Sequence, residues 1–361
     1  MKILVTGACG VTTRSVVRSL RMSSHCRDVY IVGTDICKNQ YGLFEHLCDS
    51  YVQLPHADAP QYCEMMETLI VREGVDAAIV LTEKESLNWS QRRYPTRYVV
   101  PPPRFCEIAI NKLRVHESLM KYGIVPSFVV VDSRGAIDVA RQFIESRGEA
   151  WIRAVDVGST SALGALLVHD IEELRAWFVL NKRLRTLMLS EYLPGRNFAC
   201  NLLYHDGQLV KYAIYERLEY FMGHLVPSGI SGNISRGRLV NDSTVLSVST
   251  LAVEGLVRLT GETMTGLVTV DLKGDKGGKP NVTEINLRHT ACTSAFASGG
   301  ANMAEAQVLA ALGKFELIGP AETMFPPENL LLRDIDGPPI WVANARLQLD
   351  AGRTRTEFRD D

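Results

Sequence analysis

The first hundred residues alternate between short apolar runs and amphipathic segments. "KILVTGACG" predicts a buried strand followed by a glycine turn, and "TTRSVVRSLRMS" predicts a helix. "DVYIVGTD" and "VDAAIVLTE" predict two further buried strands, with a helical segment over 61–74 between them. Strands that alternate with helices indicate a parallel, doubly wound sheet. The prolines at 101–103 end this unit, because they cannot continue a helix or a central strand.

The remaining chain mixes strands and helices in a less regular order. Residues 104–123 predict one helix that ends at Gly123, and the next segment reads strand, helix, strand, loop, helix. A hairpin-like pair, a long helix and two strands joined by "GDKGG" follow. The expected fold class is therefore α/β, with an α+β organisation after the parallel sheet. The expected units are 1–103, 104–187 and 188–325, followed by a C-terminal extension over 326–361.

Composition and charge exclude several kinds of partner. The net charge of −2 over 361 residues gives no basic surface for nucleic acid. No apolar run approaches the ~20 residues that a membrane-spanning helix needs, and "MKILVTGACG" enters a strand without a signal-peptide pattern. The cysteines include no C-x-x-C pair and are typical of reduced thiols. We therefore expect a cytoplasmic protein that acts on small molecules, and we leave a homodimer open.

The segment "TEINLRHTACTSA" carries polar side chains where a sheet interior would be apolar. Successive side chains of a strand alternate between its faces, so Glu284, Asn286 and Arg288 share one face. The same alternation puts Val282 on that face and Ile285 on the opposite one. A face with an acid, an amide and a guanidinium either faces water or holds a charged ligand.

Asp271, near the end of the preceding strand "TGLVTVDL", adds a second carboxylate. Residues opposite each other on paired strands lie close together, so the carboxylates of Asp271 and Glu284 and the amide oxygen of Asn286 can converge. Adjacent carboxylates repel unless a cation neutralises them or one takes up a proton. Oxygen ligands of this kind suit Mg²⁺. A solvent-facing hairpin with incidental charges explains this stretch equally well when it is taken alone.

A third segment has the composition of a phosphate-binding loop. "WIRAVDVGSTSALG" joins a strand that carries Arg153 to four small residues, which are Gly158, Ser159, Thr160 and Ser161. Backbone N–H groups and hydroxyls in such a loop can bind phosphate oxygens, and Arg153 would supply positive charge. An ordinary hairpin tip is the slightly better interpretation of this stretch alone, and Lys112 in "INKLRVHESL" alone reads as a surface lysine.

Taken together and in order, these segments resemble the ATP-grasp superfamily over about residues 105–312, and residues 1–100 are similar to the domain that precedes it in those enzymes. The greatest likeness is to carboxylate–amine ligases that are similar to the large subunit of carbamoyl phosphate synthase. The likeness depends on "NKLRVHESLMKYGIVP", "WIRAVDVGSTSALGALLV", "LSEYLPG" and "VDL…TEINLR". The last is the most specific, because an acid followed by Glu-x-Asn-x-Arg at the end of the domain is seldom met by chance. The resemblance implies a two-lobed ATP-grasp module after the parallel sheet.

The resemblance also implies a role for each candidate residue. The implied roles are ATP-phosphate binding for Lys112, Arg153 and the loop from Gly158 to Ser161, adenine contact for Glu191 and Leu193, Mg²⁺ or alternatively Mn²⁺ binding for Asp271, Glu284 and Asn286, and contact with the acyl-phosphate for Arg288. The family usually has Lys at the place of Arg153, which changes the geometry of the phosphate contact. It usually has a ribose-binding Glu at the place of Asn197, whose amide would bind ribose without charge assistance. Arg217 in "YERLEY" is a candidate clamp for a substrate carboxylate, with a structural ion pair as the equal alternative.

The implied reaction is ATP-dependent ligation of a carboxylate and an amine. The γ-phosphoryl group moves to the carboxylate, which gives an acyl-phosphate and ADP, and an amine then displaces phosphate to form an amide. The substrates would be amino acids or another small-molecule carboxylate. One rival is a catalytically weak ATP-grasp chain that serves as a binding or regulatory subunit. Another is an NAD(P)-binding oxidoreductase, which "VTGACG" and Asp35 suggest, but Thr13 occupies the place of the third small residue in that fingerprint.

Overall fold

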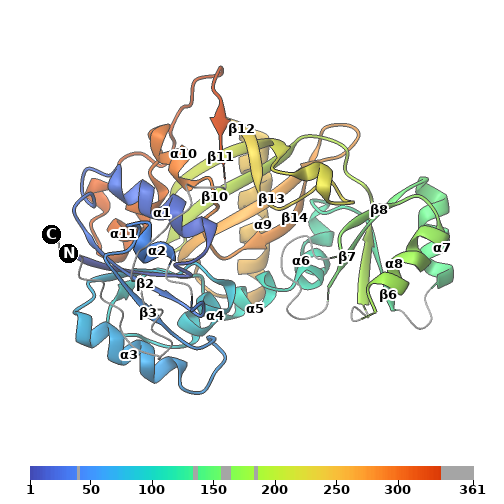
Figure 1. Ribbon diagram of the computed structural model, residues 1–361. Coiled ribbons are helices and arrows are strands. Elements are labelled where there is room, and N and C mark those ends of the chain that lie inside the picture. The colour runs from blue at the N-terminus through green and yellow to red at the C-terminus, as the bar shows by residue number, and fades with distance from the viewer. Residues whose placement is uncertain (39–40, 133–136, 156–163, 183–185, 335–361) are drawn as a thin grey trace.

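The computed structural model describes residues 1–38, 41–132, 137–155, 164–182 and 186–334. The described strands form sheets of five, four and six strands. The five-stranded and four-stranded sheets lie at opposite ends of the molecule, with the six-stranded sheet between them (Figure 1). In the described part of the chain, none of the helices combines the length and the apolar character that a membrane span requires.

The N-terminal sheet is parallel and has helices on both faces. Its strands follow the order β3-β2-β1-β4-β5, with bounds β1 Lys2–Thr6, β2 Tyr30–Asp35, β3 Ser50–Gln53, β4 Ala77–Ile79 and β5 Arg97–Tyr98. The helices of this part are α1 (Val11–Arg21), α2 (Tyr41–Phe44), α3 (Tyr62–Glu73) and α4 (Glu83–Gln91). Residues of α1 pack on one face, and residues of α3 and α4 pack on the other. The predicted doubly wound sheet is confirmed, and the edge strands β3 and β5 escaped prediction because they span only 4 and 2 residues.

Helix α11 (Met303–Ala311) joins the N-terminal sheet to the six-stranded sheet. Ala304 and Val308, one turn apart, pack against the N-terminal sheet, while Leu309 packs against the six-stranded sheet. Gln307 adds polar contacts, because its Nε2 donates to the Val99 carbonyl at 3.2 Å and its Oε1 lies 2.7 Å from His289 Nε2. A helix buried on several sides holds these two units together.

Two helices, not the single one expected over 104–123, link the N-terminal unit to the rest. They are α5 (Pro103–Ala109) and α6 (Lys112–Leu119), followed by a 3-10 turn over Met120–Tyr122. The single-helix prediction is wrong because Asn111 leaves the helical conformation, and its side chain accepts a hydrogen bond from the backbone N–H of Arg114 at 3.1 Å. This cap puts Lys112 at the first position of α6.

The four-stranded sheet is antiparallel, with strand order β6-β9-β7-β8. The elements of this lobe are β6 (Phe128–Asp132), α7 (Ile137–Arg147), β7 (Ala150–Ala154), β8 (Leu166–Val168), α8 (Ile171–Leu180) and β9 (Thr186–Ser190). Residues of α7 and α8 share one core with the sheet. The boundary expected at 187/188 falls inside β9, so this lobe extends to Ser190.

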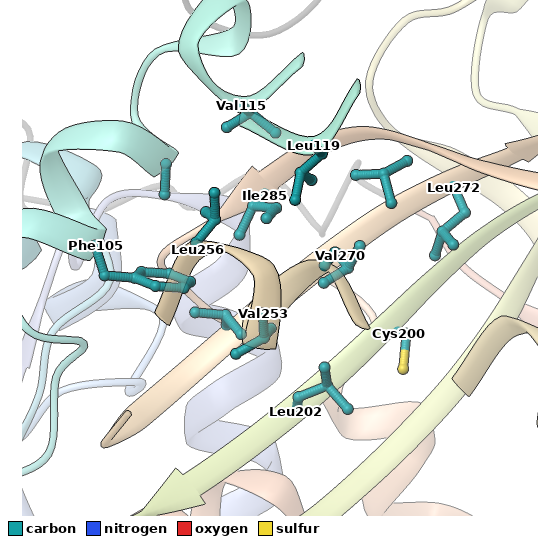
Figure 2. Packing of buried hydrophobic residues seen from close by; sticks show 14 of the residues in the cluster. Phe105, Val115, Leu119, Cys200, Leu202, Val253, Leu256, Val270, Leu272 and Ile285 are labelled. Carbon is teal, nitrogen blue, oxygen red and sulfur yellow. The ribbon is translucent and has the colours of Figure 1, made fainter. Parts of the chain in front are cut away.

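The six-stranded sheet has the order β14-β13-β10-β11-β12-β15. Its elements are β10 (Asn197–His205), β11 (Gln208–Tyr220), a 3-10 turn (Gly223–Leu225), β12 (Ile234–Val240), α9 (Ser243–Thr260), β13 (Gly266–Gly274), β14 (Pro280–Asn286), α10 (Thr293–Ser298), a 3-10 turn (Phe315–Leu317) and β15 (Leu331–Leu332). One face packs against α5, α6 and α9, as Figure 2 shows in detail. Part of the opposite face packs against α10 and α11. The expected C-terminal extension contributes β15 to this sheet, and its part from residue 335 on lies outside the described residues.

We expect Leu256→Ala to lower the free energy of unfolding by about 2–5 kcal/mol. Leu256 is 0% exposed and lies between α9 and the sheet in Figure 2, so its truncation leaves a cavity in the core. Leu259 on the same helix is 55% exposed, and Leu259→Ala is the matched control, with an expected change within about 0.5 kcal/mol. Urea unfolding followed by circular dichroism measures both. Equal losses in the two variants would contradict this view of the core.

Candidate active site

The six-stranded sheet has one face against α9 and a second face that points away from it. Where α10 and α11 cover this second face, its side chains are apolar, and the uncovered part carries polar side chains. In the polar part, Asp271 of β13 pairs directly with Glu284 of β14, and Thr269 pairs with Asn286. Directly paired residues on antiparallel strands project from the same face. The three residues of the predicted metal set are therefore neighbours on one surface.

A β-bulge in β14 produces this arrangement. Asp271 pairs with Glu284, but the next residue of β13, Leu272, pairs with Val282. Thr283 is the extra residue, and its hydroxyl donates to the Asp271 carbonyl at 3.1 Å. Val282 is consequently 0% exposed and lies in the core against α9. The prediction that Val282 shares a face with Glu284 is wrong, because strict alternation fails across a bulge.

The Asn286 amide nitrogen lies between the two carboxylates. It donates to Asp271 Oδ2 at 3.1 Å and to Glu284 Oε1 at 3.4 Å. One point on this face is thus within reach of an oxygen from each carboxylate, as a bound cation requires. A flip of the amide would present its oxygen to the same point. The described residues contain no group of three or more His, Cys, Asp or Glu that could hold a metal, so an ion here would depend on this mixed set together with substrate oxygens.

Arg217 of β11 holds the Asp271 carboxylate from the other side. Its guanidinium donates to Asp271 Oδ1 at 2.6 Å, to Asn197 Oδ1 at 2.7 Å and to the Phe198 carbonyl at 3.0 Å. Burial raises the pKa of Asp271, and the charge of Arg217 opposes that rise. The Asn197 Nδ2 donates to the Tyr220 hydroxyl at 2.8 Å, so both ends of this amide are engaged. Arg217 therefore makes the structural ion pair, and its contact with a substrate carboxylate stays a prediction.

Lys112 lies beside Glu284 at the start of α6. Its Nζ is 3.4 Å from Glu284 Oε2, and its side chain is 15% exposed, so it is not an ordinary surface lysine. Burial by itself would raise the pKa of Glu284, but the charges of Lys112 and Arg153 outweigh that effect and lower the pKa. Glu284 is therefore held in its ionised form.

Arg153 reaches the same place from the four-stranded lobe. It lies on β7, and its guanidinium donates to the Thr283 carbonyl, in the bulge, at 3.1 Å. Its Nε is shielded from water and has no hydrogen-bond partner among the described residues. Burial lowers the pKa of Arg153, against the charges of Glu284 and Asp271. The adjoining candidates Gly158, Ser159, Thr160 and Ser161 lie outside the described residues.

The segment after β9 connects the four-stranded lobe to the six-stranded sheet. The backbone N–H of Glu191 donates to the Ser127 carbonyl at 2.9 Å, and its carboxylate accepts from the Ser127 hydroxyl at 3.2 Å. Leu193 is buried at 5% exposure. The N–H of Gly195 donates to the Gly274 carbonyl at 2.8 Å, at the end of β13. Glu191 and Leu193 thus lie in the segment that connects the four-stranded lobe to the six-stranded sheet, next to the end of β13.

Arg288 lies at the border with the N-terminal unit and faces a carboxylate that the sequence did not single out. Its Nε is 3.9 Å from Glu83 Oε1. Burial raises the pKa of Glu83, against the nearby charge of Arg288. Glu83 opens α4, whose cap Thr82 accepts from the Glu85 N–H at 3.2 Å. The sequence pattern Thr-x-x-Glu directly after a buried strand could have pointed to Glu83. The pattern marks the start of a helix at the carboxyl end of a strand, and Glu83 is the first residue of that helix.

The glycine turn of the N-terminal unit is organised by Asp35. One carboxylate oxygen accepts from the Cys9 N–H and the other from the Cys37 N–H, both at 2.9 Å. A dinucleotide-binding turn needs this acidic side chain for the ribose hydroxyl. Here the side chain is engaged in holding the turn, which disfavours the oxidoreductase interpretation.

No protein-family model and no curated protein matches the chain. Solved structures do match its fold. An L-amino acid ligase from Bacillus licheniformis gives a TM-score of 0.62 at 16% identity, covering 88% of this chain and 77% of that one. An N5-carboxyaminoimidazole synthetase from Staphylococcus aureus, complexed with ADP, gives 0.61 at 13% identity over 85% of this chain and 76% of that one. D-alanyl-alanine synthetase A from Vibrio cholerae gives a TM-score of 0.60 at 12% identity, covering 88% of this chain and 98% of that one. The chain therefore has the ATP-grasp fold, as the motifs implied.

We expect Arg217→Met to lower the free energy of unfolding by about 3 kcal/mol, because it leaves the Asp271 carboxylate buried without its cation. Both side chains of this pair are 13% exposed. Arg258→Met is the matched control, since it breaks an exposed pair with Glu254 and should cost less than about 1 kcal/mol. Urea titrations at neutral pH measure both changes. Indistinguishable stabilities would mean that the Arg217–Asp271 pair does not stabilise the sheet.

Proposed function

We propose that the protein is an ATP-dependent carboxylate–amine ligase that forms an amide or peptide bond through an acyl-phosphate and releases ADP and phosphate. The observation that carries this proposal is the convergence of Asp271, Glu284 and Asn286 with cations that come from separate parts of the chain. The ATP-grasp fold supports it, and so do the matching solved structures, whose names are those of ligases and synthetases.

ATP would bind between the four-stranded lobe and the polar face of the six-stranded sheet. The proposed contacts are Lys112, Arg153 and the loop from Gly158 to Ser161 at the phosphates, Glu191 and Leu193 at the adenine, and Asn197 at the ribose. Lys112 and Arg153 approach Glu284 from α6 and from β7, so their charges meet where the terminal phosphates would lie. Positive charge fixed in a site with little water stabilises a phosphoryl group strongly.

Asp271, Glu284 and Asn286 would hold Mg²⁺, or Mn²⁺ in its place, which when bound supplies positive charge against the β- and γ-phosphates. The chain prepares these ligands in advance. Arg217 favours the charged form of Asp271, and Lys112 does the same for Glu284. The bulge fixes their register, so little reorganisation is needed when the nucleotide binds.

The reaction itself requires mainly positioning and charge neutralisation. An oxygen of the substrate carboxylate attacks the γ-phosphorus, the bond to the β-phosphate oxygen breaks, and ADP leaves. The amine nitrogen then attacks the acyl carbon, phosphate departs with the electron pair of the carbon–oxygen bond, and the proton that the nitrogen loses is taken up by the departing phosphate. Arg288, at the border with the N-terminal unit, would face the acyl-phosphate, and Arg217 would contact the substrate carboxylate. Amino acids or another small-molecule carboxylate are the proposed substrates.

The products test this function most simply. With Mg·ATP, hydroxylamine and a panel of carboxylates, we expect equal amounts of ADP and phosphate, formed only when a productive carboxylate is present. Hydroxylamine should intercept the acyl-phosphate and give a hydroxamate, which a ferric chloride assay detects. Glu284→Gln should retain less than about a tenth of this rate, because a charged ligand is lost. Glu254→Gln, which changes an exposed carboxylate on α9, is the matched control and should react normally.

Three outcomes would contradict the proposal. AMP and pyrophosphate as products would exclude phosphoryl transfer to the carboxylate. Binding of Mg·ATP without turnover across the panel would favour a binding or regulatory subunit. Tight binding of NAD(P)H would favour the oxidoreductase. Circular dichroism must show that Glu284→Gln is folded, because an unfolded variant would lose activity for another reason.

A further inference from the structure

Arg333 is a cation at the edge of the six-stranded sheet that no motif singled out. Two residues before it, Leu331 of β15 pairs with Gly237 of β12, which in turn pairs with Arg217 of β11. Residues that pair directly project from the same face, and so do residues two apart on one strand. The backbone N–H of Arg333 donates to the Ser235 carbonyl at 2.9 Å, so the pairing continues to this residue. Arg333 therefore lies on the face of the sheet that carries Arg217, two strands away from it.

The side chain of Arg333 is half-buried beside groups of this face. Its guanidinium donates to Asn233 Oδ1 at 3.0 Å. Burial lowers the pKa of Arg333, and the nearby Cys292 thiol and Tyr215 hydroxyl act against that effect. The Arg217 guanidinium also lies over Tyr215, with its central carbon 5.2 Å from the centre of the ring. Tyr215 is thus a neighbour of both arginines and connects Arg333 to the polar face.

The charge of Arg333 has no carboxylate partner in the described part of the chain. Within those residues it forms no ion pair, and its guanidinium donates to the single side chain of Asn233. Both terminal nitrogens of Arg217, in contrast, already donate to the protein, and their acceptors are Asp271, Asn197 and the Phe198 carbonyl. A cation withdrawn from water is unfavourable unless an anion compensates it. Arg333 is therefore better placed than Arg217 to bind an anion that enters from solution.

A hydroxyl without a hydrogen-bond partner lies next to this cation. In its pairing with β11, β12 steps from Arg236 to Ile234, so Ser235 is the extra residue of a bulge. The Ser235 Oγ is shielded from water and has no hydrogen-bond partner among the described residues. A shielded hydroxyl normally has such a partner. Ser235 and Arg333 are neighbours across β12 and β15, so one carboxylate can accept from both.

We propose that Arg333 and the Ser235 hydroxyl bind a carboxylate group of a substrate that does not itself react. This inference rests on the proposed function, because it takes the substrates to bind on this face of the sheet. Guanidinium groups bind carboxylates through paired, charge-assisted hydrogen bonds. Two classes of substrate supply the additional carboxylate. One is an amino acid that acts as the amine, and the other is a dicarboxylic acid of which only one carboxylate is activated.

Steady-state kinetics of the full-length protein with Mg·ATP test this subsite in two assays. In the first, hydroxylamine is the nucleophile, and the substrates are dicarboxylic acids and their half-amides, which lack the second carboxylate. In the second, the amine is an amino acid or the corresponding amino acid amide. Arg333→Met should raise the KM at least about tenfold for the substrate with the additional carboxylate and leave kcat nearly unchanged, as expected for a lost charge-assisted hydrogen bond. The amides should react equally with both proteins. An effect in the first assay assigns the carboxylate to the acid, and an effect confined to the second assigns it to the amine.

Three further variants sharpen the comparison. Arg333→Lys keeps the charge but not the paired donors, so its KM should rise less than that of Arg333→Met. Ser235→Ala should raise the same KM about threefold, the effect of one neutral hydrogen bond. Arg236→Met is the matched control, because Arg236 adjoins Ser235 on the opposite face and its side chain is 54% exposed. Its kinetic constants should equal those of the wild type.

The contrary results are distinct from one another. A KM that Arg333→Met leaves unchanged in both assays would overturn the subsite. Equal losses for substrates with and without the additional carboxylate would overturn it too, since Arg333 would then support only the fold. If Arg333→Met does not fold, the folded Ser235→Ala variant decides, and an unchanged KM there contradicts the subsite. A wild-type protein that forms neither hydroxamate nor ADP would instead refute the proposed function itself.

Discussion

The extra residue Thr283 in β14 is the constraint on which the polar face depends. On one side of the bulge, Val282 pairs with Leu272 and stays in the core against α9. On the other side, Glu284 pairs with Asp271 on the polar face. A regular strand would either expose the valine or bury the carboxylate, because a shift of one residue moves a side chain to the opposite face. The bulge also presents its carbonyl to Arg153, which joins the four-stranded lobe to the sheet at this point.

Near the bulge, ion pairs connect side chains that come from different units of the protein. Lys112 of the linking helix faces Glu284, and Arg288 faces Glu83 of the N-terminal unit. Such pairs stabilise poorly when they are exposed. Here they sit where several elements meet, and each cation favours the charged form of the carboxylate that it faces, although burial still raises the pKa of Glu83.

Much of the fold could be predicted because continuous apolar strands that alternate with helices are typical of a sheet buried on both faces. Strand alternation also brought Asp271 and Glu284 together correctly, because the short turn between their strands fixes the register. The bulge could not be predicted, since Thr283 is an unremarkable strand residue whose insertion depends on tertiary packing. Asn111 was predicted to lie inside one long helix, because the sequence around it is helical in pattern. Only the hydrogen bond from the Arg114 N–H to its side chain shows that a new helix begins there. Glu83 is a long-range neighbour, and no local pattern links it to Arg288.

The bulged pair of strands would hold both the metal ion and the nucleotide of the proposed ligase. A crystal structure with Mn²⁺ and ADP tests this assignment, because anomalous scattering locates Mn²⁺ unambiguously. We predict one strong anomalous peak between the carboxylates of Asp271 and Glu284 and the amide of Asn286, in contact with the ADP phosphates. An ordered ADP in the glycine turn of the N-terminal unit, or Mn²⁺ bound to ADP away from these three side chains, would contradict this assignment.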